Sequence, residues 1–270
     1  MTRLRSVLRL GVVATASFGA YVVLIVAGST IDALRRLRGN RRRAYAFRGR
    51  VLHAWARCLV RALRVRVETS GIPPEPPFFL VSNHLGYLDV VVFGSQMPCV
   101  FVARGDLAGW PVAGRVCRSA GTVFIDRGKK RDIPRVLGRI DDVLADGAGV
   151  IVFPEGTSSA GAGVLPFRAS LLDVPARDAT PVSWAAVSYE SVPGAPPPHL
   201  TVCWWGGMPF GSHALGLLGL PEIRARIVWG EAPVVAHDRK TLAARLHEAV
   251  ARRFRPVVSG TPLLGGEEAR

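Results

Sequence analysis

Short apolar runs that alternate with helical patterns constrain the fold of this chain more than any other feature. The runs rich in strand-forming residues lie at 78–82, 99–103, 122–125, 150–153, 181–187, 200–205 and 225–229. The clearest helical pattern between them covers residues 133–144, where one apolar stripe ends at Asp146-Gly147. Such alternation predicts an α/β domain with a mixed, largely parallel sheet flanked by helices. A last helix is expected to begin near Asp238.

Composition divides the chain into four segments. An apolar and basic N-terminal segment, expected to anchor the protein, covers residues 1–45, and a basic amphipathic helix is expected within residues 46–70. A proline-rich linker then leads into the α/β domain, which we place at residues 71–256. Residues 257–270 are expected to form a disordered tail. The length is ample for one α/β core with an appendage.

The segment Leu10–Gly28 carries no charge and approaches the ~20 residues that cross a bilayer as a helix. Arginines flank it at Arg3, Arg5 and Arg9 and at Arg35, Arg36, Arg38, Arg41, Arg42 and Arg43. The alternative is a cleaved signal peptide ending near Ala27, but the larger positive charge after the segment opposes export. By the positive-inside rule, we expect an inner-membrane anchor with the α/β domain facing the cytoplasm. Whether the segment spans the bilayer or lies in it stays open.

The segment from Arg48 to Val67 alternates arginines with apolar residues at helical spacing. A basic amphipathic helix of this kind can lie on anionic lipid, or it can pack on the domain as an ordinary surface helix. The pattern alone favours neither alternative.

The charge balance is strongly basic, with 35 Lys and Arg against 20 Asp and Glu. Nearly all of the basic residues are Arg, a skew that is also typical of GC-rich bacterial genomes. Because they concentrate beside the apolar segment, a membrane surface is favoured over nucleic acid as the basic partner. The cysteines at 58, 99, 117 and 203 show no C-x-x-C or zinc spacing, so we expect free thiols and no metal site.

Polar motifs follow three of the predicted strands. His84 and Asp89 come after the first strand, Asp126-Arg127 after the third, and Glu155 after the fourth. In open α/β sheets, ligands bind beyond the carboxyl ends of the strands, so these motifs predict one shared site. A histidine beside a carboxylate can act as a general base, because the carboxylate fixes the tautomer and stabilises the imidazolium.

Taken in order, these motifs resemble the glycerolipid acyltransferases typified by lysophosphatidic acid acyltransferase. The segments that carry the resemblance are Asn83–Asp89, Gly121–Arg127, Phe153–Thr157 and Thr180-Pro181-Val182, within residues 78 to 187. The resemblance implies that a fatty acyl chain moves from acyl-CoA or acyl carrier protein to the free hydroxyl of a lysophospholipid acceptor. It implies that 1-acylglycerol-3-phosphate is the preferred acceptor and that the protein contacts membrane lipid. It implies no cofactor and no nucleic-acid partner.

The resemblance assigns His84 as the base and Asp89 as the residue that orients it. Residues five apart on a regular helix point about 140° away from each other. The two side chains can therefore meet only if His84 lies in the loop before a helix and Asp89 in its first turns. Gly86 permits that entry into the helix.

The remaining candidate residues are expected to bind substrate. Arg127 would grip the acceptor phosphate through two hydrogen bonds, with Asp126 fixing its direction. Glu155 would hold Arg127 or an acceptor group, in a tight turn that also includes Gly156 and Thr157. Positive potential around phosphate or CoA is expected from Arg104 and Arg168.

One departure from the family pattern concerns the acceptor. Many members continue the Glu155 turn with Arg-Ser, whereas this chain has Ser158-Ser159. With Cys203–Gly206, this variant looks more like the branch that includes lyso-ornithine lipid acyltransferases, so lyso-ornithine lipid is the alternative acceptor. A non-catalytic lipid-binding protein of the same fold is an alternative from another class.

Overall fold

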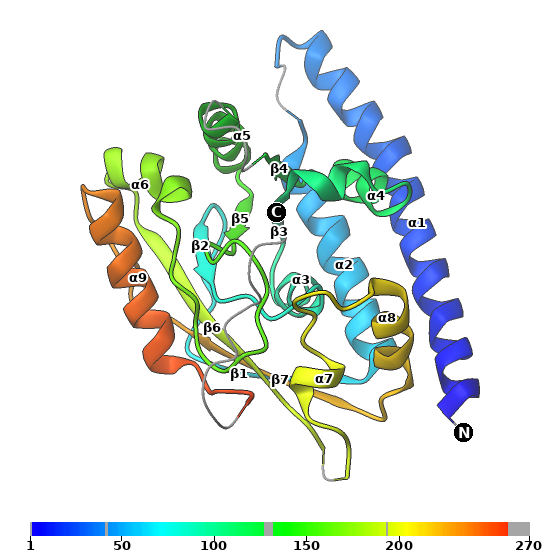
Figure 1. Ribbon diagram of the computed structural model, residues 1–270. Helices are drawn as coiled ribbons and strands as arrows, with labels where there is room; N and C mark the ends of the chain where they lie inside the picture. Colours follow the sequence, from blue (N-terminus) through cyan, green and yellow to red (C-terminus); the bar gives the residue numbers. More distant parts are fainter. Residues whose placement is uncertain (1, 41–42, 127–131, 193, 259–270) are drawn as a thin grey trace.

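A mixed sheet lies at the centre of the computed structural model, which describes residues 2–40, 43–126, 132–192 and 194–258 (Figure 1). Its seven strands are β1 (Val65–Ser70), β2 (Phe79–Ser82), β3 (Cys99–Arg104), β4 (Val123–Ile125), β5 (Gly149–Val152), β6 (Val182–Glu190) and β7 (Ile223–Trp229). They follow the order β1-β7-β6-β2-β5-β3-β4. The β6–β7 pair is antiparallel and every other neighbouring pair is parallel.

This topology gives the sheet two distinct edges. Because β6, β2, β5, β3 and β4 all run the same way, their carboxyl ends meet at one edge, which we call the carboxyl edge. The opposite side, where these strands begin, is called the amino edge. Strand β6 is much longer than β2, and its register pairs Ser82, the last residue of β2, with Ala185. The second half of β6 therefore extends beyond the end of β2.

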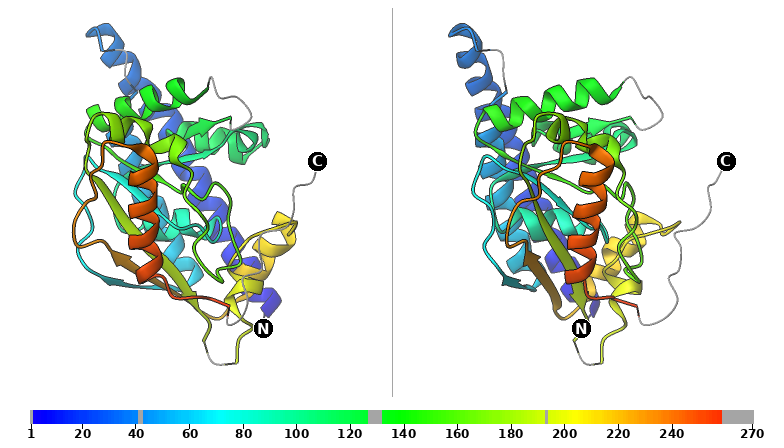
Figure 2. Two further views of the ribbon diagram at one scale, coloured as in Figure 1. Left: turned by 60° about the vertical axis from the view of Figure 1, so that its left-hand side comes forward. Right: turned by 90° about the vertical axis from the view of Figure 1, so that its left-hand side faces the viewer.

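Helices cover both faces of the sheet. They are α1 (Thr2–Leu37), α2 (Tyr45–Leu63), α3 (Leu88–Gly94), η1 (Gly105–Gly109), α4 (Ala113–Ser119), α5 (Ile133–Ala145), η3 (Ala169–Leu172), α6 (Asp173–Arg177), α7 (Pro198–Thr201), α8 (Phe210–Gly219) and α9 (Arg239–Arg253). Helices α2 and α3 cover one face, with α1 and α8 outside them, and α5, α6 and α9 cover the other (Figures 1 and 2).

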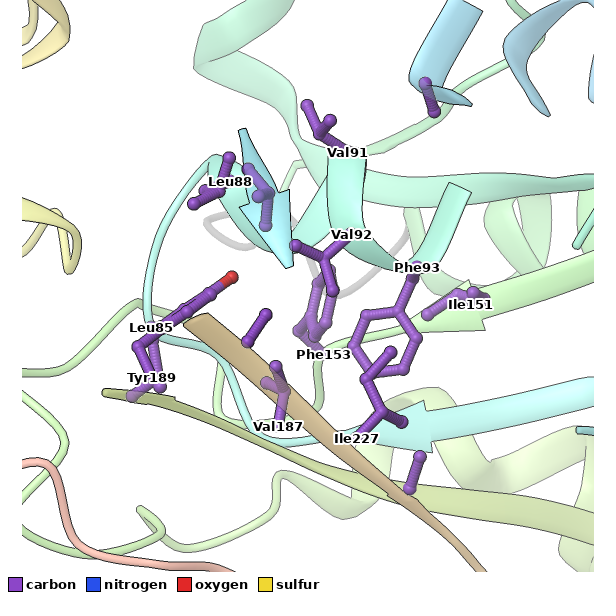
Figure 3. Close-up of a cluster of buried hydrophobic side chains, with 14 of the residues drawn as sticks. Leu85, Leu88, Val91, Val92, Phe93, Ile151, Phe153, Val187, Tyr189 and Ile227 are labelled. Carbon is purple, nitrogen blue, oxygen red and sulfur yellow. The ribbon is translucent and has the colours of Figure 1, made fainter. Parts of the chain in front are cut away.

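The face under α3 holds the larger of two apolar cores. Val92 and Phe93 of α3 point toward Phe153, Val187 and Ile227, which come from the sheet and the turn after β5 (Figure 3). Burying side chains of this size stabilises the fold by roughly 1.5–3 kcal/mol each. Helix α3 and the strands beneath it are therefore held firmly in place.

The predicted mixed, largely parallel α/β fold is confirmed, and six of the seven predicted strands are found. The exception is 200–205, where α7 ends at Thr201 and a loop follows. That prediction is wrong because a short apolar run does not by itself distinguish a strand from a buried helix end or loop. The helix expected near Asp238 is also confirmed, since the Asp238 side chain accepts a hydrogen bond from the Thr241 N–H as an N-cap.

Two predicted boundaries are wrong. The amphipathic helix expected to reach Val67 ends at Leu63, because Arg64 takes a left-handed conformation (φ 55°) and β1 then pairs with β7. Residues 65–70 thus belong to the sheet of the α/β domain. The disordered tail does not begin at Val257, whose N–H donates to the carbonyl of Gly161 at 2.7 Å. Residues 259–270 of that tail lie outside the described residues.

Helix α1 is long and apolar enough to cross a membrane, by length and composition. No other helix in the described residues meets this test. One side of α1 nevertheless lies along the domain. Arg9 donates to the Leu218 carbonyl at 3.1 Å, Ser17 accepts from Trp55 at 3.0 Å, and an ion pair at 2.9 Å joins α1 to Arg48.

Helix α2 lies between α1 and the sheet. Its residues Ala56, Leu59 and Leu63 are buried, and its contacts include α3, β1 and β3. This helix could have been expected to lie on lipid or to pack on the domain, and in the structure it packs on the domain. Most of the large apolar side chains that remain exposed belong to α1.

Candidate active site

His84 and Asp89 meet at the carboxyl edge of the sheet. His84 lies in the loop that follows β2, and Asp89 lies in the first turn of α3. The His84 Nδ1 atom is 2.7 Å from Asp89 Oδ2. The predicted arrangement, with the histidine in the loop and the aspartate in the helix, is confirmed.

The Asp89 carboxylate is fully buried and accepts four hydrogen bonds. Besides His84, the N–H groups of Leu85 (2.7 Å) and Gly86 (3.1 Å) donate to Oδ2, and the hydroxyl of Tyr189 donates to Oδ1 at 2.6 Å. Four donors stabilise a negative charge that would otherwise be costly to bury. They also hold the carboxylate in one orientation.

The His84 ring is fixed by stacking as well as by its hydrogen bond. It lies on Phe153 with ring centroids 4.2 Å apart and an interplanar angle of 12°. When Nδ1 donates to Asp89, the neutral ring leaves Nε2 unprotonated and able to accept a proton. The side chain is 22% exposed, whereas Asp89 is 0% exposed, so Nε2 is the accessible part of a buried pair.

Glu155 supports the same loop from the next strand. Its Oε1 accepts the backbone N–H of His84 at 3.0 Å, while Oε2 is buried and has no hydrogen-bond partner among the described residues. Burial raises the pKa of this carboxyl well above its usual range, because the hydrogen bond from the His84 N–H offsets only part of the cost of burying the charge. Glu155 is therefore a contact of the histidine itself, which the sequence analysis did not predict.

Two further contacts fix the path of the loop. The Asn83 side chain bridges β2 to β6, donating to the Val187 carbonyl at 2.9 Å and accepting from its N–H at 2.8 Å. The Leu85 carbonyl accepts the N–H of Trp204 at 2.9 Å. A Cβ at Gly86 would lie 2.8 Å from that same nitrogen, so this position requires glycine for the close approach as well as for entry into α3.

Tyr189 belongs to this site although no sequence motif predicts it. It lies near the end of β6, in the part that extends beyond β2, and it reaches back into the cluster between β6 and α3 (Figure 3). Burial and the adjacent Asp89 charge raise the pKa of its hydroxyl well above the usual range, so it is a hydrogen-bond donor. No spacing or motif links it to Asp89, which lies 100 residues earlier.

The other predicted binding residues lie along the same edge. Arg104 ends β3 opposite Ile125 of β4, which places Arg104 and Asp126 about 10 Å and about 14 Å across the sheet from β2. Arg104 is exposed and paired with Asp106 at 2.9 Å. Arg127 lies outside the described residues.

The turn after β5 carries the remaining predicted residues. Gly156 is buried and adopts φ +83°, a conformation that favours glycine, while Thr157 is exposed. The backbone N–H of Arg168 donates to the Pro154 carbonyl at 2.9 Å, so this exposed arginine lies beside the turn. Ser158, where many family members have arginine, donates from its hydroxyl to the Trp204 carbonyl.

Within the described ranges, no group of three or more His, Cys, Asp or Glu side chains is placed to hold a metal ion. The described cysteines are free. His84 Nε2 is placed to take up a proton, supported by the buried charge of Asp89.

Comparison with known proteins identifies related chains. A family model described as Acyltransferase matches residues 64–187. A lyso-ornithine lipid O-acyltransferase of Rhizobium meliloti is 33% identical over 213 residues, which cover 75% of this chain and 72% of that protein. A 1-acyl-sn-glycerol-3-phosphate acyltransferase of Neisseria meningitidis serogroup B is 29% identical over 208 residues, covering 75% and 80%.

The fold has a counterpart among solved structures. The crystal structure of the 1-acyl-sn-glycerophosphate acyltransferase PlsC from Thermotoga maritima superposes with a TM-score of 0.58 over 92% of this chain and 95% of that one. The two sequences are 20% identical. At that identity the likeness concerns the fold.

Proposed function

Because this chain belongs to the acyltransferase family and transfers an acyl chain to a lysolipid, we propose that His84 is the base that activates the lipid hydroxyl. The observation that carries the proposal is the 2.7 Å contact between His84 Nδ1 and Asp89, which leaves Nε2 available to a substrate. A general base of this kind contributes roughly 10²- to 10⁴-fold to a rate.

The reaction follows from the position of that nitrogen. As the acceptor hydroxyl attacks the thioester carbonyl carbon, Nε2 takes its proton and the ring becomes an imidazolium, which Asp89 stabilises. The tetrahedral intermediate then collapses, the carbon–sulfur bond breaks, and the imidazolium returns the proton to the departing thiolate. The products are a diacyl lipid and the free thiol of CoA or of the carrier protein.

Substitution of His84 tests this assignment. We expect His84→Ala to lower turnover by roughly 10²- to 10⁴-fold with lysophosphatidic acid and acyl-CoA or acyl carrier protein, because the change removes the imidazole that takes the proton of the hydroxyl. The matched control is His247→Ala, which changes a histidine on α9 that contacts the Val164 carbonyl. Wild-type turnover by the His84 variant would show that another group is the base.

For the acceptor we propose 1-acylglycerol-3-phosphate, converted to phosphatidic acid. The support is the group of arginines expected around a phosphate at the carboxyl edge, namely Arg127, Arg104 and Arg168. Guanidinium groups bind phosphate oxygens in pairs of hydrogen bonds. Asp126, Glu155, Gly156 and Thr157 complete the proposed acceptor site as residues that shape or orient it.

Lyso-ornithine lipid is the second candidate acceptor, favoured by the Ser158 turn. The Ser158 hydroxyl is directed to the Trp204 carbonyl, so the guanidinium common at this position is replaced by a group that faces the protein. An ornithine head group carries an amine and a carboxylate instead of a phosphate, so the loss of one phosphate-binding guanidinium is compatible with this acceptor. An acceptor panel with one fixed donor separates the two, since kcat/KM should be highest for the true acceptor.

The same acceptor panel tests the role of Arg168 and whether the protein is an enzyme. Arg168→Gln should raise KM for lysophosphatidic acid several-fold with little change in kcat, and it should raise KM for lyso-ornithine lipid less, because a carboxylate carries less charge than a phosphate. Complete absence of acyl transfer across the panel would instead support a non-catalytic lipid-binding protein.

We also propose that α1 anchors the chain to the cytoplasmic face of the inner membrane, as the flanking arginines predict. This places His84 where both a membrane lipid and a soluble donor can reach it. Protease digestion of inverted and right-side-out vesicles tests the orientation: the α/β domain should be cleaved only in the inverted ones.

A further inference from the structure

A cleft of about 250 Å³ lies between α1 and α4, away from His84. One wall is formed by Arg43, Arg48, Arg115 and Arg118, and the other by residues of α1. The cleft is at the amino edge of the sheet. Arg48 donates to the Ser119 carbonyl, just before β4 begins, and a Cβ at Gly49 would lie 3.1 Å from the backbone nitrogen of Cys99, the first residue of β3. His84 is at the opposite, carboxyl edge.

The arginines that line this cleft outnumber the described carboxylates that contact them. Asp32 is bound by Arg48 through two contacts, at 2.9 and 3.2 Å, and is 3.9 Å from Arg43. Within the part of the chain that the structure describes, Arg115 and Arg118 show no ion pair. Burial and the neighbouring Arg48 lower the pKa of Arg43. An anion is the component that would balance this group of like charges.

The opposite wall indicates what kind of anion fits. It consists of Tyr21, Leu24, Ile25 and Ser29, all from the uncharged part of α1 or its end. Beside the cleft, α1 exposes further apolar side chains, with Val22 41% and Val26 62% exposed. A ligand that matches both walls has a phosphate at one end and hydrocarbon at the other.

We propose that this cleft binds the phosphate of an anionic membrane phospholipid whose acyl chains lie along the exposed apolar face of α1. Arg115 and Arg118 are the principal phosphate ligands, because Arg48 is occupied by Asp32, whereas in Arg118 the hydrogen bond to the Ala108 carbonyl at 2.7 Å engages only Nη1. The bound lipid is distinct from the acceptor at His84, and it orients the enzyme on the membrane by joining α1 to α4.

The test is native mass spectrometry of the full-length protein in detergent, incubated with dioleoylphosphatidylglycerol. The site variant is Arg115→Gln/Arg118→Gln, and the control is Arg245→Gln/Arg252→Gln, which removes the same charge from exposed positions on α9 on the far side of the sheet (Figure 1). Wild type and control should each retain one lipid. The site variant should bind it at least about tenfold more weakly.

A competition arm separates a lipid from a free phosphate. Inorganic phosphate at the concentration of the lipid should leave retention unchanged, since it lacks the acyl chains that contact α1. Equal retention by all three proteins, or full displacement by inorganic phosphate, would overturn the proposal. Melting temperatures without lipid check that the site variant is folded. Because no acyl donor is present, the result is independent of the catalytic proposal.

Discussion

Two buried carboxylates flank His84, and the protein treats them differently. Asp89 accepts four hydrogen bonds, three of them on Oδ2, so that its charge and orientation are both fixed. Glu155 accepts the His84 N–H on one oxygen, while its other oxygen is buried with no hydrogen-bond partner among the described residues. The first environment stabilises a carboxylate, and the second favours the neutral acid.

The difference suggests different tasks for the two groups. Asp89 contacts the ring that carries the proton, so its charge acts on the imidazolium. Glu155 contacts the backbone of the same residue, so it positions the loop, and this task requires an acceptor oxygen and no charge. Substitutions that remove charge alone should therefore harm Asp89 and spare Glu155.

The largest expected effect is at Asp89. Asp89→Ala removes both the ring orientation and the charge, and we expect turnover to fall about 10³- to 10⁴-fold. Asp89→Asn should fall less, about 10²-fold, because the amide oxygen can still accept the three N–H donors while its NH₂ faces Tyr189. Steady-state kinetics of both variants separate the two contributions, because the Asn variant loses only the charge and the Ala variant also loses the orientation of the ring. Equal losses would show that orientation contributes nothing beyond charge.

Glu155 is expected to show the opposite sensitivity. Glu155→Ala leaves the buried N–H of His84 without an acceptor, which costs about 1–3 kcal/mol in the free energy of unfolding, and turnover should fall about tenfold. Glu155→Gln keeps the acceptor oxygen, so it should stay near wild type in turnover and, at pH 4.5, in the free energy of unfolding. Denaturant unfolding and kcat report on the two quantities. A Gln variant as impaired as the Ala variant would contradict a purely positional role.

Tyr189→Phe should give a smaller effect on activity than either alanine variant. It removes one donor from Oδ1 and leaves the three on Oδ2, so His84 keeps its orientation. We expect a loss of a few-fold in kcat and about 1–3 kcal/mol in the free energy of unfolding, from the buried oxygen left without a donor. Tyr45→Phe, a change at another buried tyrosine on α2, is the matched control.

The residues of this comparison also show how far the sequence is informative. His84 and Asp89 were predictable because they share one short segment, and a strand followed by a helix leaves few ways to join them. The hydrogen bond between Glu155 and the His84 N–H was not predictable, because it depends on β2 and β5 being neighbours in the sheet, and the sequence does not give the strand order. Tyr189 needed still more, namely the parallel pairing of β6 with β2 and the extra length of β6.

The same reasoning applies away from the site. The alternation of strands and helices predicted the sheet, since periodicity is a local property of the chain. The docking of α1 along α2 was not predictable, because the Arg48–Asp32 ion pair joins two segments whose separate patterns indicate only an apolar helix and a basic one. The arginine cleft arises from that docking, so composition could suggest its charge but not its place.

The smallest expected effect is the pH dependence of stability at Glu155. Burial raises its pKa in the folded state above the value of about 4.3 expected in the unfolded chain. Between these two values the folded protein holds a proton that the unfolded chain has released, so the contribution of Glu155 to stability falls as pH rises through this window. In the Glu155→Gln variant the glutamine cannot ionise, so its contribution to stability does not change over the same pH range.

The melting temperature of Glu155→Gln relative to wild type should therefore increase from pH 4.5 to pH 7.5. Glu75→Gln, at an exposed position in the linker, supplies the control and should show no such trend. Other groups titrate equally in wild type and variant, so the difference isolates Glu155. If that difference were independent of pH, Glu155 would carry its charge in the folded state, and the contrast with Asp89 would reduce to the number of donors each receives.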